Sequence, residues 1–482
     1  MVVLFQYSSW YFVSLKRLGS GKVLLTGLKD FHEFERTKIQ QAYDLAKELH
    51  AGQFRLTGEP YFMHPVGVAQ ILIDAGKDYQ TICAGLLHDT IEDTRITYEE
   101  LKEIFGTEIA DIVEGVTKAN VFAHANKEDI TLATDRKILQ YLIKDIRVID
   151  VKLADRVHNM QTASAWSLET QQRKARENLS LYVPLAKSIG AYRIKKILED
   201  RSFEILNPYQ YKLITGMREV IKRNYGPDIE RAKNNVKEEL EKQHITAHEI
   251  KIQYKNAYEI YASLKGNINE MLQLDDLINI KIIVKDILTC YQTLGIVNEI
   301  YKPKNVIDYI GNPKPNRYQS LHSLITYKTN KDALVKIRTQ AMDLKATYGV
   351  SHQEYSTMGG QKLFQGLAEV DNTYRDDKEF LNHAKEILFG EKITVFSEAG
   401  ERCELAKGAT VVDFAFYEGS GLNDYQATVN GKVAPENYVL QNGDAISIHV
   451  SKEERKLNDE YCKNAKTFYA TQILQRKLKP EK

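Results

Sequence analysis

A change in the spacing of apolar residues near residue 249 constrains the fold more than any other feature of this chain. Over residues 30–207 apolar side chains recur at helical spacing and strand patterns are nearly absent, which predicts an all-α domain. After residue 249, apolar and largely β-branched runs at 277–284 and 323–327, and an alternating run at 333–337, predict strands. Helical stretches separate these runs, so an α/β domain is expected there.

The chain has 482 residues, too many for one hydrophobic core, and a multidomain α+β fold is therefore expected. Alternation at 392–396, with turn signals at Gly431 and at Asn442-Gly443-Asp444, predicts a small sheet domain near the C-terminus. The predicted segments are an N-terminal extension (1–29), a helical domain (30–206), connecting helices (207–248), an α/β domain (249–350), a helical linker (351–389), a small sheet domain (390–450) and a charged helical tail (451–482).

Composition excludes several functional classes. Lys+Arg 66 against Asp+Glu 65 leaves a formal charge of +1, so no basic field points to DNA. No apolar run approaches the roughly 18 residues of a membrane span, so no membrane association is expected. The cysteines stand far apart without a CxxC pair, which argues against structural zinc and favours a reduced, cytoplasmic setting. They are Cys83, Cys290, Cys403 and Cys462.

A cluster of ionisable residues follows the small and apolar residues 84–87, which are expected to lie on a buried helix. His88 and Asp89 are adjacent, Glu92 lies four residues after His88, and Asp93 lies four residues after Asp89. On one continuous helix these four groups would crowd the same side of two turns. A helix interior cannot stabilise that much negative charge, but a divalent cation can.

Two further segments supply similar groups. Asp155 and Asn159 share a helix face after the apolar run 148–151, and His64 precedes Pro65 at an expected helix start. Each group alone could be an ordinary solvated side chain, but together His64, His88, Asp89 and Asp155 form a nitrogen and carboxylate ligand set. Such a set suits Mn²⁺ or Fe²⁺, and its chemistry is hydrolysis of a phosphoester or pyrophosphate.

The segments that carry these residues resemble the hydrolase domain of the RelA/SpoT alarmone synthetase–hydrolase family, a variant of the HD phosphohydrolase fold. The resemblance lies in His64-Pro65, in Leu-Leu-His-Asp-Thr-Ile-Glu-Asp-Thr (86–94) and in Lys-Leu-Ala-Asp-Arg-Val-His-Asn-Met (152–160), and overall similarity covers about 31–450. It implies that the metal is Mn²⁺. It also implies that the 3′-pyrophosphate of guanosine tetraphosphate or pentaphosphate, (p)ppGpp, is removed to leave GDP or GTP.

The same resemblance implies roles for four residues around the metal. Glu92 and Asp93 would prepare or stabilise the attacking water, and Arg55 and Asn159 would contact the nucleotide. Departures from the family pattern, which would weaken binding of the charged substrate without removing the metal chemistry, occur at Leu56, Gln161 and Ser188.

The second domain resembles the family's synthetase. The segment 312–322 is similar to the one that holds the guanine-nucleotide acceptor, and Tyr318 would stack on the base. Asp276 matches the family's metal-binding aspartate. The nucleotide-site residues that the resemblance implies, expected here as a vestigial site, are Tyr318, Lys314, Asn316, His322 and Asp276.

Leu334 stands where the family has the second metal-binding carboxylate of the synthetase. Transfer of pyrophosphate from ATP needs Mg²⁺ and, in this family, a base for the 3′-hydroxyl proton, and leucine supplies neither. The loop at 303–306 is also shortened. Charged or polar groups of the family pattern are replaced at Lys336, Gln253, Lys281 and Ile307. We therefore expect a synthetase fold without synthetase activity.

Two alternatives stay open. One is a bifunctional enzyme in which Lys281 and other groups compensate for the losses, and the other is a non-catalytic guanine-nucleotide-binding regulator.

The last unit resembles the family's TGS domain, which implies a small β-grasp-like fold. The resemblance lies in 407–414, 429–432 and 440–444. Only about thirty residues follow it, so ribosome contact of the kind made by further regulatory domains is not expected.

Overall fold

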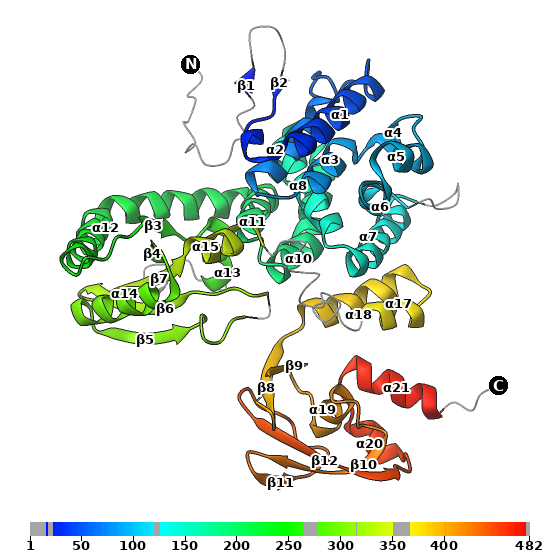
Figure 1. Ribbon diagram of the computed structural model, residues 1–482, viewed down its shortest axis with the longest axis vertical. Coiled ribbons are helices and arrows are strands. Elements are labelled where there is room, and N and C mark those ends of the chain that lie inside the picture. Colours follow the sequence, from blue (N-terminus) through cyan, green and yellow to red (C-terminus); the bar gives the residue numbers. More distant parts are fainter. Residues whose placement is uncertain are drawn as a thin grey trace. The chain divides into compact units, whose positions relative to one another are not determined.

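The computed structural model describes residues 16–17, 23–119, 126–264, 277–314, 316–349, 367–400 and 402–478 (Figure 1). The chain divides into two compact units, residues 1–120 with 144–363, and residues 121–143 with 364–482. A short pairing joins β1 (Lys16–Arg17) to β2 (Val23–Leu24). Within the described ranges, no helix combines the length and the apolar character needed to cross a membrane. The multidomain α+β expectation is confirmed.

From residue 28 to residue 206 the regular elements described in the first unit are helical, which confirms the predicted all-α domain. Its helices are α1 (Glu33–Leu49), α2 (Met63–Asp74), α3 (Tyr79–Leu87), α4 (Thr90–Asp93), α5 (Tyr98–Phe105), α6 (Thr107–Val116), α8 (Arg147–Gln161), α9 (Leu168–Glu177), α10 (Val183–Ser188) and α11 (Tyr192–Leu206). A 3₁₀ turn, η1 (Leu28–Asp30), precedes α1. A second 3₁₀ turn, η2 (Ala163–Ala165), follows α8, and a π-helical turn, η3 (Asn178–Tyr182), follows α9.

Helices α2, α3 and α8 form the centre of this domain and pack against one another. In α2 every residue from 64 to 73 is buried, as is every residue from 81 to 87 in α3. Asp78 caps α3 by accepting a hydrogen bond from the backbone N–H of Thr81. Because these helices are surrounded by protein, polar side chains on them point into the interior and need partners there.

A mixed five-stranded sheet follows the 35-residue helix α12 (Pro208–Lys242), with strand order β3-β4-β7-β6-β5. The strands are β3 (Glu249–Tyr254), β4 (Ile278–Val284), β5 (Pro303–Asp308), β6 (Leu321–Lys328) and β7 (Lys331–Thr339). Its helices are α13 (Ala257–Leu264), α14 (Ile287–Ile300) and α15 (Gln340–Tyr348). Only β4 and β7 pair in parallel. Ile229 and Val236 of α12 share a buried core with Ile280 and Val335 of the sheet.

The two outer strands, β3 and β5, were not predicted. The sequence pattern did predict β4, β6 and β7, which occupy the three inner positions of the sheet. Strand β4 is buried at every residue, whereas β5 is exposed at every residue and β3 is partly exposed throughout. An outer strand needs fewer apolar residues than an inner one, so its sequence signal is weaker.

The second unit contains a five-stranded sheet of order β11-β10-β12-β8-β9. Its strands are β8 (Lys392–Ser397), β9 (Arg402–Ala406), β10 (Asn423–Val429), β11 (Lys432–Ala434) and β12 (Ala445–Glu454), and its helices are α7 (Lys127–Lys144), α17 (Leu367–Thr373), α18 (Asp377–Phe389), α19 (Val411–Tyr417), α20 (Asp459–Asn464) and α21 (Phe468–Leu478). Although α7 falls in the sequence range predicted for the helical domain, its Arg136 forms ion pairs with Asp371 and Asp377 and lies over the ring of Phe380.

The segment predicted as a charged helical tail begins with the end of β12 and continues into α20 and α21. Tyr461 and Leu474 of these helices are buried in one cluster with Val412 and Phe416 of α19. The Asp413 carboxylate accepts backbone hydrogen bonds from residues 466 and 467. Both helices are therefore attached to the small sheet domain by apolar packing and by a buried carboxylate.

Candidate metal centre

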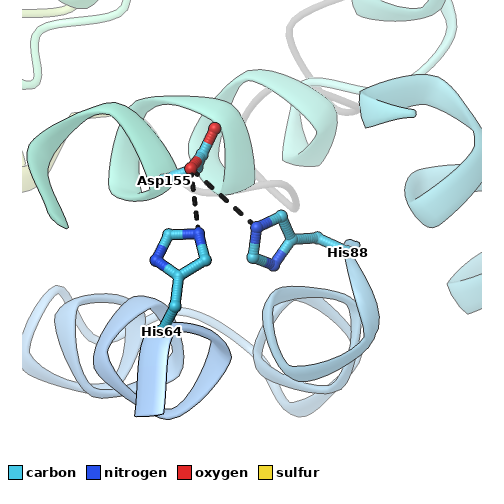
Figure 2. Close-up of side chains that lie close together, drawn as sticks. All are labelled: His64, His88 and Asp155. Carbon is cyan, nitrogen blue, oxygen red and sulfur yellow. Dashed lines mark ion pairs between the residues drawn. The ribbon is translucent and has the colours of Figure 1, made fainter. Parts of the chain in front are cut away.

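Four of the predicted site residues meet where α2, α3 and α8 pack. His64 lies in the first turn of α2, His88 directly follows α3, and Asp155 lies in the middle of α8 (Figure 2). Asp89 immediately precedes α4. The sequence pattern predicted one helix through His88, Asp89 and the acids that follow, but α3 ends at Leu87 and a separate short helix begins at Thr90.

The two imidazoles and the Asp155 carboxylate face one another. The His64 Nε2 lies 3.3 Å from Asp155 Oδ1, and the His88 Nε2 lies 3.9 Å from the same oxygen (Figure 2). Each of the three residues offers one possible ligand atom, and these three atoms lie within 4.8 Å of one another. Asp89 Oδ2 lies 3.1 Å from His88 Nε2 and 3.5 Å from His64 Nε2. All four predicted ligands are therefore brought together.

The donors fit a divalent cation. His88 Nδ1 donates to the Gly85 carbonyl oxygen at 2.9 Å, while its buried Nε2 lies 3.1 Å from Asp89 Oδ2 without making a well-aligned hydrogen bond among the described residues. Buried polar atoms of this kind need a partner or a metal. An imidazole nitrogen fixed from behind by a carbonyl, and facing two carboxylates, is the arrangement common at metal sites.

The electrostatics of the cluster also favour a bound cation. For Asp89, the imidazoles of His88 and His64 outweigh burial and hold the pKa of the carboxyl well below its usual range. The two imidazoles respond differently. Burial lowers the pKa of His64, but for His88 the carboxylates Asp89 and Asp155 outweigh burial and raise the pKa to about 9. The site thus favours positive charge between its carboxylates, as a proton or as a cation.

Tyr61 belongs to this centre but was not singled out as a site residue. Its hydroxyl donates to Asp89 Oδ2 at 2.8 Å. Burial, followed by the Asp89 charge, raises the pKa of this phenol, so it remains a donor. The residue was overlooked because a tyrosine before a His-Pro pair carries no distinctive pattern.

The two acidic residues of α4 lie beside the cluster in different environments. Glu92 forms an ion pair with Lys118 and also accepts a hydrogen bond from the backbone N–H of that residue. Burial, then the charge of Asp89, raises the pKa of Asp93. Glu92 is therefore paired with a lysine, whereas burial and the neighbouring Asp89 charge favour the neutral form of Asp93 more than in water.

Arg55 and Asn159, the predicted nucleotide contacts, are hydrogen-bonded to each other. Arg55 Nη2 donates to Asn159 Oδ1 at 2.8 Å, and Arg55 Nη1 donates to Thr162 Oγ1 at 3.2 Å. Asn159 Nδ2 in turn donates to Asp155 Oδ1 at 2.5 Å. Thr162 was not predicted. The half-buried guanidinium of Arg55 is therefore linked through the Asn159 amide to Asp155 of the candidate cluster.

Most residues of the predicted guanine-nucleotide segment also gather. Tyr318 Oη and His322 Nε2 lie 2.9 Å apart, and the Lys314 ammonium lies over the rings of Tyr309 and Tyr318 at 4.6 and 5.2 Å. Asn316 joins this group through its side-chain oxygen, which accepts a hydrogen bond from the Tyr318 backbone N–H at 3.2 Å, while its amide nitrogen donates to the Lys187 carbonyl oxygen. Asp276 lies outside the described residues.

The sheet shows what surrounds Leu334. Its register partners are Asn279 on β4 and Leu324 on β6, so neither neighbouring strand places a carboxylate beside it. Lys281, which replaces a family arginine, is buried, and its ammonium pairs with Glu249 at 2.8 Å and with Asp343 at 3.0 Å. That charge is already neutralised within the domain.

Three family matches cover much of the chain. Residues 42–192 match the family described as HD domain, residues 252–359 a region found in RelA/SpoT proteins, and residues 393–450 the TGS domain.

Three relatives are similar over most of the chain. Bifunctional (p)ppGpp synthase/hydrolase SpoT of Escherichia coli is 36% identical over 415 residues, covering 84% of this chain and 59% of that protein. A GTP pyrophosphokinase of Myxococcus xanthus is 37% identical, covering 87% and 58%. A guanosine-3′,5′-bis(diphosphate) 3′-pyrophosphohydrolase of Aquifex aeolicus is 35% identical, covering 92% and 65%. The chain thus spans less than two thirds of the length of these relatives.

Proposed function

Since this chain belongs to the RelA/SpoT family, we propose that its helical domain is a metal-dependent 3′-pyrophosphohydrolase of (p)ppGpp, which releases pyrophosphate and leaves GDP or GTP. The observation that carries this proposal is the buried group of His64, His88 and Asp155, whose ligand atoms lie within 4.8 Å of one another. Asp89 adds a second carboxylate to the same point. We propose all four as metal ligands.

Mn²⁺ is the proposed ion, because imidazole nitrogens and carboxylate oxygens together suit a borderline divalent metal. When bound, it polarises phosphate oxygens and lowers the pKa of a bound water. Three groups outside the cluster hold three of the proposed ligands in place. The Gly85 carbonyl orients His88, the Tyr61 hydroxyl holds Asp89, and the Asn159 amide holds Asp155.

Metal binding is expected to release about one proton at pH 7 to 8. Its source is His88, whose pKa of about 9 leaves it protonated there in the metal-free protein, while a metal needs its neutral form. Raising the pH removes that proton, so the apparent Mn²⁺ affinity should rise by up to about tenfold per pH unit and level off above pH 9. Calorimetry in buffers of different ionisation enthalpy measures the released proton. An affinity that is constant from pH 7 to pH 9 would contradict the assignment.

The two acidic residues of α4 are proposed to act on the attacking water, one of them by accepting its proton. Asp93 has a raised pKa beside the metal cluster, which suits a group that accepts a proton and later returns it. Glu92, held by its ion pair with Lys118, is proposed to orient the same water. The two acids thus divide the roles of proton exchange and orientation.

Arg55 and Asn159 are proposed to hold the nucleotide. A planar guanidinium suits bidentate contact with phosphate, and a lost hydrogen bond to a charged group commonly removes about 1.5–3 kcal/mol. Arg55→Ala is therefore expected to lower kcat/KM for ppGpp by roughly 10- to 150-fold. Arg55→Lys, which keeps the charge but loses the fork, should fall between wild type and Arg55→Ala. Steady-state kinetics measures both, and equal activity of the three proteins would exclude this role.

The α/β domain is proposed to be a synthetase fold without synthetase activity, which keeps a guanine-nucleotide site around Tyr318. Leu334 has no carboxylate beside it on the neighbouring strands, and Lys281 is bound to two internal acids. A bifunctional enzyme is the second candidate, favoured by the similarity to a bifunctional relative. Location in the cytoplasm and the absence of DNA or ribosome contact stay predictions.

One assay separates these functions. Purified protein is incubated with Mn²⁺ and ppGpp in one arm, and with Mg²⁺, ATP and GDP in the other. The proposal predicts pyrophosphate and GDP in the first arm, loss of that activity with a chelator, and no product in the second. If neither arm gave product but the protein still bound guanine nucleotide, it would instead be a non-catalytic regulator.

A further inference from the structure

His158 lies beside the metal cluster, on α8, and has no role in the proposed reaction. It follows Asp155 by three residues and is neither one of the proposed ligands nor one of the proposed nucleotide contacts. Its imidazole lies against His64, with ring centroids 4.9 Å apart. The two Nδ1 atoms are 2.9 Å apart, a hydrogen-bond distance.

That contact determines where the protons of both rings lie. His64 Nε2 faces Asp155 and Asp89, so a cation bound there needs the lone pair of this nitrogen. The ring proton of His64 must then be on Nδ1, which donates to His158 Nδ1. His158 is therefore an acceptor at Nδ1 and carries its own proton on Nε2.

The space that His158 fills depends on Gly67. This glycine lies on α2, three residues after His64, and a Cβ added to it would come within 2.2 Å of the His158 ring. Because the obstructing group is an aromatic ring and not the end of a long flexible chain, the whole His158 imidazole would have to move to relieve that overlap. A residue without a side chain at 67 thus lets His158 reach the back of His64.

Comparison of the two histidines in the cluster shows why His158 matters. His88 Nδ1 is held by the Gly85 carbonyl, a backbone group that no side-chain substitution removes. His64 Nδ1 is held by a side chain instead. Arg55 Nη1 approaches the same His158 nitrogen at 3.5 Å, so the nucleotide-binding guanidinium also adjoins this contact.

We propose that His158 is a positioning residue that accepts the His64 Nδ1 proton and thereby holds the His64 Nε2 toward the metal. The inference rests on the proposed metal-dependent function. Partners behind metal-binding histidines commonly contribute 10- to 100-fold to metal affinity. It follows that the identity of residue 158 should change Mn²⁺ affinity, although residue 158 does not touch the ion.

The test measures Mn²⁺ affinity by equilibrium dialysis for wild type and three variants. His158→Leu removes the acceptor and is expected to weaken Mn²⁺ binding by roughly 10- to 100-fold. His158→Asn keeps an acceptor oxygen near the position of Nδ1, so we expect it to restore most of that loss. Gly67→Ala displaces the ring and should resemble His158→Leu. Thermal unfolding without metal shows that each variant is folded.

Thr162→Val is the matched control, since it removes another Arg55 contact without touching His64. Its Mn²⁺ affinity should equal that of wild type. The positioning role is wrong if His158→Leu or Gly67→Ala binds Mn²⁺ as wild type does, or if His158→Asn is as weak as His158→Leu. A wild-type protein that binds no Mn²⁺ would instead refute the proposed metal-dependent function itself.

Discussion

Replacing Asp155 with asparagine is expected to abolish hydrolysis of ppGpp, lowering kcat by on the order of 10³-fold or more. Asp155 is buried, and its Oδ1 lies 3.3 Å from His64 Nε2 and 3.9 Å from His88 Nε2. The amide keeps the size of the side chain but removes its negative charge, so two neutral imidazoles and one carboxylate remain. Mn²⁺ content after dialysis and initial rates of pyrophosphate release measure the effect.

Asp44→Asn serves as the control for this substitution. Asp44 is an exposed residue of α1, and its carboxylate accepts a hydrogen bond from the Gln40 side chain at 3.0 Å. We expect normal activity and normal Mn²⁺ content in this variant. An Asp155→Asn protein that retained Mn²⁺ and activity would show that the ligand set is wrong.

Incubation with Mg²⁺, ATP and GDP is expected to yield no ppGpp above background. The reason is the sheet surface around Leu334. This leucine stands where the family pattern has a carboxylate, and its register partners among the described residues are Asn279 and Leu324. The Lys281 ammonium is paired with Glu249 and Asp343. Without metal neutralisation and a base, the barrier to pyrophosphoryl transfer is not lowered. Thin-layer separation of labelled nucleotides measures the product.

Leu334→Glu is the informative companion variant. It restores the missing carboxylate but leaves Gln253, Lys281 and Ile307 in place of the family's charged groups. We expect this variant to remain silent as well, because the contacts for the ATP phosphates are still lost. Synthesis by the wild-type chain would establish the bifunctional alternative, and synthesis by Leu334→Glu alone would show that this one position determines the loss.

The inner strands and the helical domain were predictable because each is long or strongly apolar. Strand β4 is buried at all seven residues, and its run of branched apolar side chains needs no tertiary information to be recognised. The outer strands β3 and β5 were missed because their side chains face solvent on much of their surface. Likewise, the tail appeared charged, yet Tyr461 and Leu474 pack against α19.

The sequence alone determined which chemical groups are available for the metal centre. Local motifs are enough to recognise His64, His88, Asp89 and Asp155, and also the leucine at 334. Recognition of each residue needs only its type and its spacing from nearby residues. Assignment of a substrate came from family resemblance, since ligand types alone do not distinguish among phosphorylated molecules.

Only the tertiary structure decided how those groups are held. His158 reaches His64 from a helix more than ninety positions away in sequence, through space that Gly67 leaves open. Tyr61 binds Asp89 across 28 positions, and Arg55 meets Asn159 across 104. Hydrogen bonds and steric gaps of this kind depend on how helices pack against one another. No periodicity within a single helix records them.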